Sequence, residues 1–413
     1  MPPSPLWNRL QKSDHAENTP EENWVGAGGE IEPKRMSAAV QNFGIALLTL
    51  ECSARPNQNV FISPLSVFLA LAMVENGAGG ETKSTMRQVL GLPPGVEARS
   101  LNTAANQLLH SLQSNKGIEL SIVSALWVDR RIALAPNFVN LCSECFHAVA
   151  ETLDMKNPAS AGAINKWAAE KTRGKISTIV SAESIAATAT LIANAVYFKG
   201  KFLFPFRKEA TQPRPFHLAL GREKLVPMMQ KTGMRTRYRT GKRCEAAALR
   251  YSRGEANRPF SASAIELILV LPERGVSPEA ILKEDLFALF RDPEEWVELE
   301  LLMPRFNVDF EARLNQPLTQ MGMGIAMKFP GADFVPMGSE LFFIDTVVHK
   351  TRLEMDEEGT TAAAATTGDL VLGSSMVQRQ LRKKTLVFDR PFAVLLRDTA
   401  NGALLFAGVV YEP

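Results

Sequence analysis

The sequence has few cysteines and no long apolar segment, and each scarcity excludes a class of protein. Four cysteines in 413 residues give no reason to expect a disulfide-stapled scaffold. No apolar run reaches the roughly 18 residues of a membrane-spanning helix, so we expect no membrane insertion. Neither sign of charge is in excess, since 46 Lys and Arg residues stand against 44 Asp and Glu residues. Nucleic acid and anionic membranes are therefore not expected as partners.

Catalytic and cofactor motifs are also missing. The chain has five histidines and contains no GxSxG elbow, HExxH pair, Walker loop or GxGxxG turn. Cys142 and Cys145 form a CxxC followed by His147, but no second pair of ligands stands at finger-like spacing, which favours free thiols at a helix end. His349 follows an apolar strand and is expected to be a hydrogen-bonded core histidine. We expect no enzymatic activity, no cofactor and no metal.

The first 36 residues are polar, with scattered Pro and Gly, and predict a flexible N-terminal arm. They lack a basic start followed by an apolar core, so no secretion signal is expected in this chain, and no Asn-x-Ser/Thr acceptor occurs in it. Both features favour a protein that is not secreted, although removal of a signal segment would leave the same sequence.

Beyond this arm, apolar patterning predicts helices early in the chain and strands late. Ser37 is the expected N-cap of the first helix, and Pro64 suits the first turn of the second. No βαβ rhythm, repeat or linker is present, so the prediction is an α+β fold with residues 37–413 in one domain. Expected helices lie near residues 37–50, 60–74, 97–112 and 161–172. Expected strands lie at residues 120–128, 190–198, 265–271, 297–303, 342–355, 385–388, 392–397 and 403–410.

Two stretches are rich in basic residues. Residues 231–243 carry six and residues 379–384 carry four. Either could bind a polyanion, but the favoured interpretation is a solvated strand for the first and a solvated loop for the second.

The unusual segment is residues 356–384, which lies between two predicted strands without an element of its own. Long structureless loops in compact domains are uncommon and usually functional. Its first half contains the small, uncharged run TTAAAATT at residues 360–367. In strand geometry, residues 360, 362, 364, 366, 368 and 370 share one face, and Asp369, the only charge from 360 to 371, falls on the other. This alternation predicts that the segment can be added to a sheet as a strand.

Short motifs in a fixed order identify a family. They are residues 59–66 (NVFISPLS), 194–200 (NAVYFKG), 349–350 (HK) with 356–360 (DEEGT), 388–392 (FDRPF) and 406–408 (FAG). Together they resemble the serpins, from about residue 37 to the last residue.

The resemblance implies a serpin fold, with about three β-sheets, about nine helices and an exposed reactive-centre loop at about residues 357–384. It also implies a suicide-substrate inhibitor of serine proteases: the loop is cleaved, inserts into the central sheet and traps the acyl-enzyme. An arm of about 17 residues would supply roughly 55 Å of new strand. The expected partner is a target serine protease, held as a covalent complex, and the expected state is a monomer that can polymerise.

The same resemblance places residues in named roles. Arg305 matches the basic partner of Glu357, and Phe202 stands where the family usually has Trp, which removes an indole N–H donor. The matched sheet-opening region is Ser63, Ser66, Asn194, Phe202, Arg305 and His349. The matched hinge is Glu357, Glu358, Gly359, Thr360, Thr361, Ala362, Ala363, Ala364 and Ala365.

The reactive bond is predicted by counting. Seventeen residues from Glu357 end at Gly373, so Gly373–Ser374 is the nominal bond. Leu372 or Met376 would suit chymotrypsin-like or elastase-like proteases. Arg379 would suit a trypsin-like pocket but lengthens the inserting arm by six residues.

Several alternatives remain open. A non-inhibitory serpin (carrier, chaperone or storage protein) and a cross-class inhibitor of cysteine proteases are the competing functions. Residues 97–113, the helix that would carry a heparin site, contain Arg99 as their only Lys or Arg, which argues against heparin binding there. The family default is the extracellular space, with the cytoplasm as the alternative.

Overall fold

The computed structural model describes residues 31, 33–92, 95–113, 117–254, 262–282, 295–338, 343–359 and 381–413. Helices dominate the first part of this range and strands the remainder, which confirms the α+β prediction. The α-helices are α2 (Pro33–Ala54), α3 (Pro64–Glu75), α4 (Gly80–Val89), α5 (Ala98–Gln113), α6 (Pro136–Phe146), α7 (Ala159–Lys171), α8 (Ala182–Ala186), α9 (Pro278–Ile281) and α10 (Asn315–Met321). None of these described helices is long and apolar enough to cross a membrane.

The strands form two sheets, and short 3-10 turns connect some of them. The strands are β1 (Val60–Ile62), β2 (Ile118–Asp129), β3 (Val149–Leu153), β4 (Thr190–Gly200), β5 (Gln212–His217), β6 (Glu223–Thr240), β7 (Cys244–Ser252), β8 (Ala262–Pro272), β9 (Trp296–Pro304), β10 (Phe306–Arg313), β11 (Thr346–Met355), β12 (Arg382–Val387), β13 (Phe392–Asp398) and β14 (Leu404–Val410). The 3-10 turns are η1 (Lys208–Ala210), η2 (Ala219–Gly221), η4 (Met323–Met327) and η5 (Val335–Met337).

The five-stranded sheet has the order β10–β11–β4–β2–β3. β4 is antiparallel to β2, and β10 is antiparallel to β11, whereas the central pair β4–β11 is parallel. Parallel strands need a long crossover, and here β4 ends at Gly200 while β11 begins only at Thr346. The centre of this sheet is therefore a junction between two blocks of strands.

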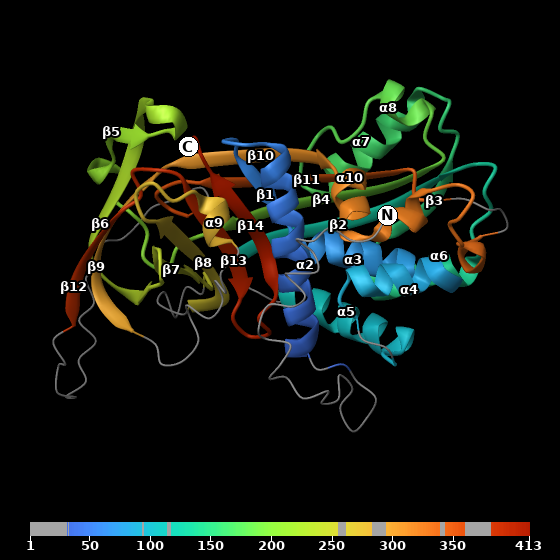
Figure 1. Ribbon diagram of the computed structural model, residues 1–413, viewed down its shortest axis with the longest axis horizontal. Coiled ribbons are helices and arrows are strands. Elements are labelled where there is room, and N and C mark those ends of the chain that lie inside the picture. Colours follow the sequence, from blue (N-terminus) through green and yellow to red (C-terminus); the bar gives the residue numbers. More distant parts are fainter. Residues whose placement is uncertain are drawn as a thin grey trace.

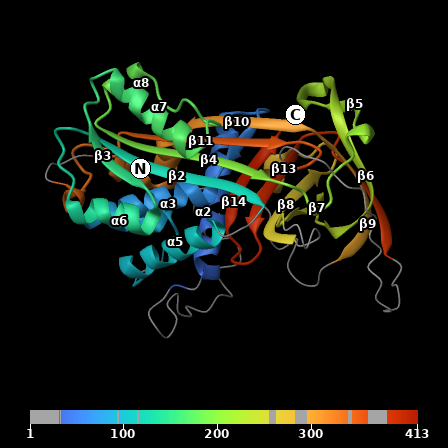
Figure 2. The ribbon, with the colours of Figure 1, turned by 180° about the vertical axis from the view of Figure 1, so that it is seen from behind.

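Around β4 both faces of the five-stranded sheet are covered, as Figures 1 and 2 show, whereas the edge strand β10 alternates buried and exposed residues. Leu191, Ala193 and Ala195 of β4 pack in the cluster that contains Ile164 of α7. Ile192, Val196 and Phe198, which alternate with them, belong to the main core on the other face. The continuous apolar run of β4 is thus explained, because a strand buried on both faces needs no polar alternation.

The nine-stranded sheet consists of two parts that share the long strand β6. One part runs β1–β14–β13–β8–β7–β6, and the other contains β5, β6, β9 and β12. β6 pairs with β9 and β5 over most of its length and with β7 only at residues 238–240. The five-stranded sheet and these two parts correspond to the three sheets expected from the sequence.

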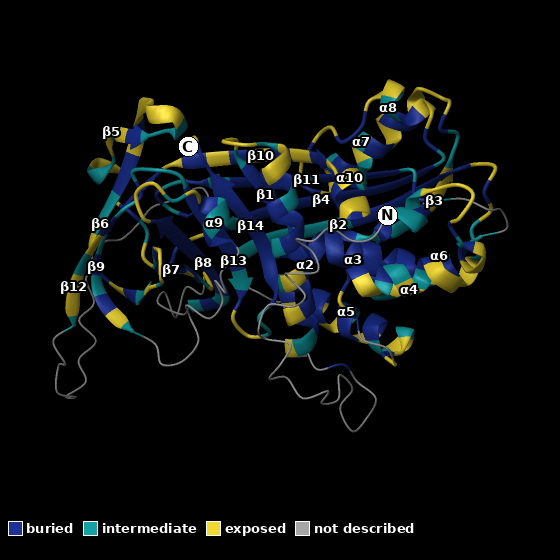
Figure 3. Ribbon diagram, viewed as in Figure 1, coloured by how far each residue is buried: buried dark blue, intermediate teal, exposed yellow. Residues whose placement is uncertain are grey.

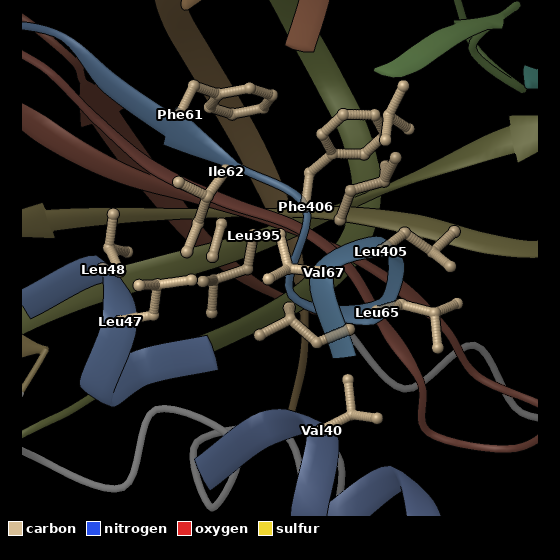
Figure 4. Packing of buried hydrophobic residues seen from close by; sticks show 14 of the residues in the cluster. Val40, Leu47, Leu48, Phe61, Ile62, Leu65, Val67, Leu395, Leu405 and Phe406 are labelled. Carbon is tan, nitrogen blue, oxygen red and sulfur yellow. The ribbon is translucent and has the colours of Figure 1, made fainter. Parts of the chain in front are cut away.

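The main core lies where α2 and α3 meet β1, β13 and β14. Figure 4 shows Val40 and Leu47 of α2, Leu65 of α3, Phe61 of β1 and Phe406 of β14 among the side chains packed in this core. The last two rings stack, with centroids 5.3 Å apart. Figure 3 shows α3, β13 and β14 almost entirely buried, whereas α2 is exposed along one side. Fully burying one such side chain contributes about 1.5–3 kcal/mol, so this region anchors the fold.

Two local expectations were wrong. The first helix begins at Pro33, not at Ser37, because proline is pre-organised for the first helical position. The Ser37 hydroxyl instead donates to the carbonyl of Asn401, 2.7 Å away.

The second error concerns the basic stretch at 379–384, because residues 382–384 belong to β12 and not to a loop. β12 lies beside β9, and carboxylates of β9 and of the residue before it approach β12: Lys383 is 3.8 Å from Glu298, and Arg382 is 3.7 Å from Glu295. Arg239 of β6 also approaches Glu295, at 4.0 Å. The two basic stretches therefore flank an acidic strand that partly neutralises them.

Candidate functional site

The site is built around the seam between β4 and β11. Eight residue pairs, from Thr346 with Leu191 to Leu353 with Phe198, align along it in parallel. The chain leaves β11 towards the segment 360–380 and is described again at residue 381, just before β12 on the other sheet. A segment that follows β11 therefore bridges two sheets.

A cluster of four buried polar residues crosses this seam, and we call it the central polar cluster: Ser63, Ser66, Asn194 and His349. The sequence resemblance predicted this set, and the structure brings all four together. His349 of β11 stands opposite Asn194 of β4, with its Nδ1 2.6 Å from the Asn194 Oδ1. Its Nε2 accepts the backbone N–H of Ser63, the N-cap of α3, at 3.0 Å. The ring thus links both strands to α3.

Asn194 completes the cluster. Its Nδ2 lies 2.5 Å from the Ser66 hydroxyl and 2.9 Å from the hydroxyl of Ser124 on β2. Ser124 was not predicted as part of this cluster, because a serine within an apolar strand usually indicates a solvent-facing position. The register of β2 against β4, which pairs Ser124 with Asn194, reveals it.

Burial governs the charge of His349. The side chain is fully buried, and removal from water lowers the pKa of His349 to about 3. A neutral ring has one donor and one acceptor nitrogen, which matches its two partners here. His349 is therefore an uncharged structural connector, as the sequence predicted for a core histidine.

After β11, the chain begins to reverse at residues 356–359. The backbone N–H of Gly359 donates to the carbonyl of Asp356 at 3.1 Å, and the N–H of Glu358 donates to the Asp356 carboxylate at 2.9 Å. Gly359 has a φ of +107°, and a Cβ there would lie 2.6 Å from the carbonyl oxygen of Gly200 and from the backbone nitrogen of Phe202. Glycine is needed at this position because of both its backbone angle and this close approach.

The reversed segment is fixed to the chain that leaves β4. The N–H of Phe202 donates to the carbonyl of Glu358 at 2.8 Å, and the N–H of Phe206 donates to that of Glu357 at 2.7 Å. Phe202 is 4% exposed and stacks on Tyr251 with ring centroids 5.2 Å apart. Phenylalanine therefore fills this position by stacking, without the indole donor usual in the family.

Glu357 is held by an ion pair in a buried position. Its carboxylate accepts from Arg305, as predicted, and also from the Thr211 hydroxyl at 2.7 Å. Burial acts to raise the pKa of Glu357, but the hydrogen bonds from Arg305 and Thr211 outweigh burial, so the pKa is lowered. Next to it, Glu358 pairs with Lys208 of η1 at 3.0 Å. Glu357 is therefore charged at neutral pH, and the ion pairs of both glutamates anchor the start of the segment.

The rest of the predicted loop lies outside the described residues. This applies to the hinge residues Thr360, Thr361 and Ala362–Ala365, and to the reactive-bond candidates Leu372, Gly373, Ser374, Met376 and Arg379. Their roles remain predictions from the sequence.

Comparison with known proteins agrees with the fold and the motifs. A family model described as "Serpin (serine protease inhibitor)" matches residues 38–413. An uncharacterized serpin-like protein of Thermococcus kodakarensis is 33% identical, with 86% of this chain and 81% of that protein covered. Serpin-Z7 of Hordeum vulgare is 32% identical, with 92% and 97% covered.

Among solved structures, human thyroxine-binding globulin superposes with a TM-score of 0.81 and 22% identity, covering 92% of this chain and 99% of that one. At this identity the match shows the fold alone.

Proposed function

The chain belongs to the serpin family, a family of protease inhibitors, and we propose that it is a suicide-substrate inhibitor of serine proteases. The hydroxyl of the protease's catalytic serine attacks the carbonyl carbon of the reactive bond in the loop. The peptide C–N bond breaks, the new amine leaves on the C-terminal fragment, and an ester joins the N-terminal arm to the protease. Insertion of this arm between β4 and β11 then displaces the protease before water can hydrolyse the ester.

One observation carries this proposal: the reversal at residues 356–359 lies against the exit of β4, at the end of a parallel seam. An arm that turns back here runs antiparallel to β11, and therefore also antiparallel to β4. Insertion would replace one parallel ladder of eight residue pairs by two antiparallel ladders. Antiparallel pairing is slightly more stable per residue, and the number of ladders doubles, so the exchange is favourable.

The central polar cluster sets a barrier to this exchange. Opening the seam separates His349 from Asn194, and both are buried. A buried polar group that loses its partner costs about 1–3 kcal/mol. We propose that the cluster keeps the sheet closed until the arm is cut, and that the Arg305–Glu357 pair does the same at the end of the seam.

Two other functions remain candidates. A carrier, chaperone or storage role fits the same fold, as the likeness to thyroxine-binding globulin illustrates. The small residues Thr360 and Ala362–Ala365 favour an inserting arm, since a charged or bulky arm would be excluded from the sheet. Inhibition of cysteine proteases would use the same insertion with a thioester in place of the ester.

The decisive experiment is incubation with trypsin-like, chymotrypsin-like and elastase-like proteases, followed by denaturing electrophoresis. An inhibitor gives a complex with its protease that survives SDS, whereas a carrier or substrate gives cleavage alone. A papain-like protease in the same series tests the cross-class alternative. N-terminal sequencing of the released fragment identifies the reactive bond, for which Gly373–Ser374 is our proposal.

We also propose that residues 37–413 form one domain and that the protein is a monomer with a risk of polymerisation. The arm predicted at 1–36 overlaps the start of α2 at Pro33, and residues 1–30 lie outside the described residues. Polymerisation is expected because, once β4 and β11 separate, their free edges can pair with the loop of a second molecule.

A further inference from the structure

Two imidazole rings from different helices meet on the surface of the molecule. His110 lies in the last turn of α5, and His147 caps the C-terminus of α6. α5 packs against α6, and their rings lie with centroids 4.9 Å apart and planes at 75°. His110 is exposed and His147 is half-buried, so both rings can be reached from solvent. Figures 1 and 2 show the two helices on the same side of the five-stranded sheet.

We propose that His110 and His147 together bind a divalent first-row transition-metal ion, of which Zn²⁺ is the natural probe, and that the ion links α5 to α6. Two imidazoles on one tetrahedral zinc ion, at Zn–N distances of 2.0–2.1 Å, have ring centroids roughly 5 Å apart. The observed separation is already close to this value. Within the described part of the chain no third His, Cys, Asp or Glu joins them, so water would complete the coordination.

The backbone fixes one of the ligands in advance. His147 has a φ of 50° at the helix end, and its N–H bonds to the carbonyl of Cys142. Asn106 of α5 donates to the carbonyl of Glu144 on α6 at 2.8 Å, which holds the two helices at this spacing without metal.

Gln113 supplies the supporting contact that metal-binding histidines usually have. Its amide nitrogen Nε2 lies 3.2 Å from Nδ1 of His147, and a 180° rotation of the amide brings its oxygen to the same place. With the amide oxygen turned to the ring, Gln113 accepts the Nδ1–H and leaves Nε2 of His147 free for the metal. Gln113 lies three residues after His110 on α5, so both side chains belong to one helical face.

The thiols of the CxxC motif do not serve this site. Cys142 is fully buried, and burial raises the pKa of its thiol to about 12. Burial, followed by the charge of Glu144, also raises the pKa of Cys145. In the described part of the chain neither sulfur joins the two histidines in a group that could hold a metal. Cys142 and Cys145 are free thiols, as the sequence favoured, and the proposed site depends on the packing of α5 on α6 instead.

The test is calorimetric titration of the full chain, carrying no polyhistidine tag, with ZnCl₂ at neutral pH. We expect one saturable site in the parent protein, a loss of affinity of at least about tenfold in His110→Gln and in His147→Gln, and a smaller loss in Gln113→Ala. His110→Gln is the cleaner variant because its side chain is exposed, and its melting temperature without metal should equal that of the parent.

His217→Gln is the matched control. Unlike the two proposed ligands, His217 lies near carboxylates, with Glu223 at 2.9 Å and Asp389 at 3.8 Å. It is therefore the residue most able to bind zinc at a different place. Unchanged binding in His217→Gln supports the proposal. Absence of saturable binding in the parent, or loss of binding in His217→Gln with retention in His110→Gln, overturns it. With Cu²⁺ as the ion, electron paramagnetic resonance should show two coupled nitrogens in the parent and one in His110→Gln.

Discussion

At the scale of single residues, the burial of His349 makes the free energy of unfolding depend on pH. The ring is neutral in the folded protein and becomes charged in the unfolded chain below its ordinary pKa of about 6.5. The unfolded state therefore binds more protons than the native state between pH 6.5 and about 3. In this range the free energy of unfolding falls as the pH falls.

This difference gives a prediction for His349→Gln. The variant should be less stable than the parent at neutral pH, because Gln cannot reproduce both ring contacts. Between pH 6.5 and 5 the parent should lose up to about 1.4 kcal/mol more per pH unit than the variant, since one proton is involved. Chemical unfolding at several pH values measures both slopes. Equal slopes would mean that His349 is not the buried neutral group we describe.

A second prediction concerns Glu357, because the hydrogen bonds of its buried carboxylate with Arg305 and Thr211 hold the start of the hinge in place. Glu357→Lys places an ammonium group beside Arg305, with 2% of the native side chain exposed to water. An uncompensated buried charge costs several kcal/mol, so the end of the seam should open. We expect additional polymer on native gels after mild heating.

The control for this variant is Glu311→Lys. Glu311 pairs with Lys350 at 3.0 Å on the same sheet, but its side chain is 53% exposed. Exposed pairs contribute only about 0–1 kcal/mol, so this charge reversal should leave the gel pattern unchanged. If both variants polymerise equally, or neither does, the hinge pair is not what holds the seam closed.

At the scale of secondary structure, the sequence predicts well what depends on local pattern. The run 190–198 is predicted as a strand and Pro64 as the first turn of a helix, and both predictions are confirmed, because apolar patterning and proline geometry are local properties. Positions set by distant contacts were missed. Ser124 depends on register with β4, and His147 meets His110, 37 residues earlier in the sequence, only because α5 packs on α6.

The alternation in the arm predicts opposite results for two neighbouring substitutions. If residues 360–370 insert as a strand, Thr360 points into the sheet interior and Thr361 points outward. Thr360→Arg should therefore slow insertion, since a barrier higher by about 1.4 kcal/mol already slows it tenfold. The ester would then be hydrolysed first, and the variant should be cut at the same bond but release active protease.

Thr361→Arg is the paired control, with the same substitution one position later. It should inhibit nearly as well as the parent. The measurement is moles of inhibitor consumed per mole of protease silenced. A similar ratio for the two variants would refute the alternation, whereas a high ratio for Thr360→Arg alone supports it.

At the scale of the whole molecule, the seam divides the five-stranded sheet into the block β10–β11 and the block β4–β2–β3. Across the seam the polar contacts include the backbone ladder of β4 with β11 and the bond between His349 and Asn194. α7 covers one face of the second block and α3 contacts the other, so separation of the blocks would reorganise both layers. A local cut in the loop can thus change the stability of the entire chain.

The last prediction follows from this arrangement. Cleavage within residues 372–379 frees the arm, and an inserted arm would pair with β4 and β11 at once. A central strand with two ladders adds backbone hydrogen bonds, each contributing about 0.5–1.5 kcal/mol net, and buries the small side chains of 360–366. The cleaved protein should therefore melt at a higher temperature than the intact one, contrary to the usual effect of a nick. Calorimetry before and after limited proteolysis measures this, with Thr360→Arg as the control that is cut but gains less. An equal or lower melting temperature after cleavage would rule out insertion while leaving the fold as described.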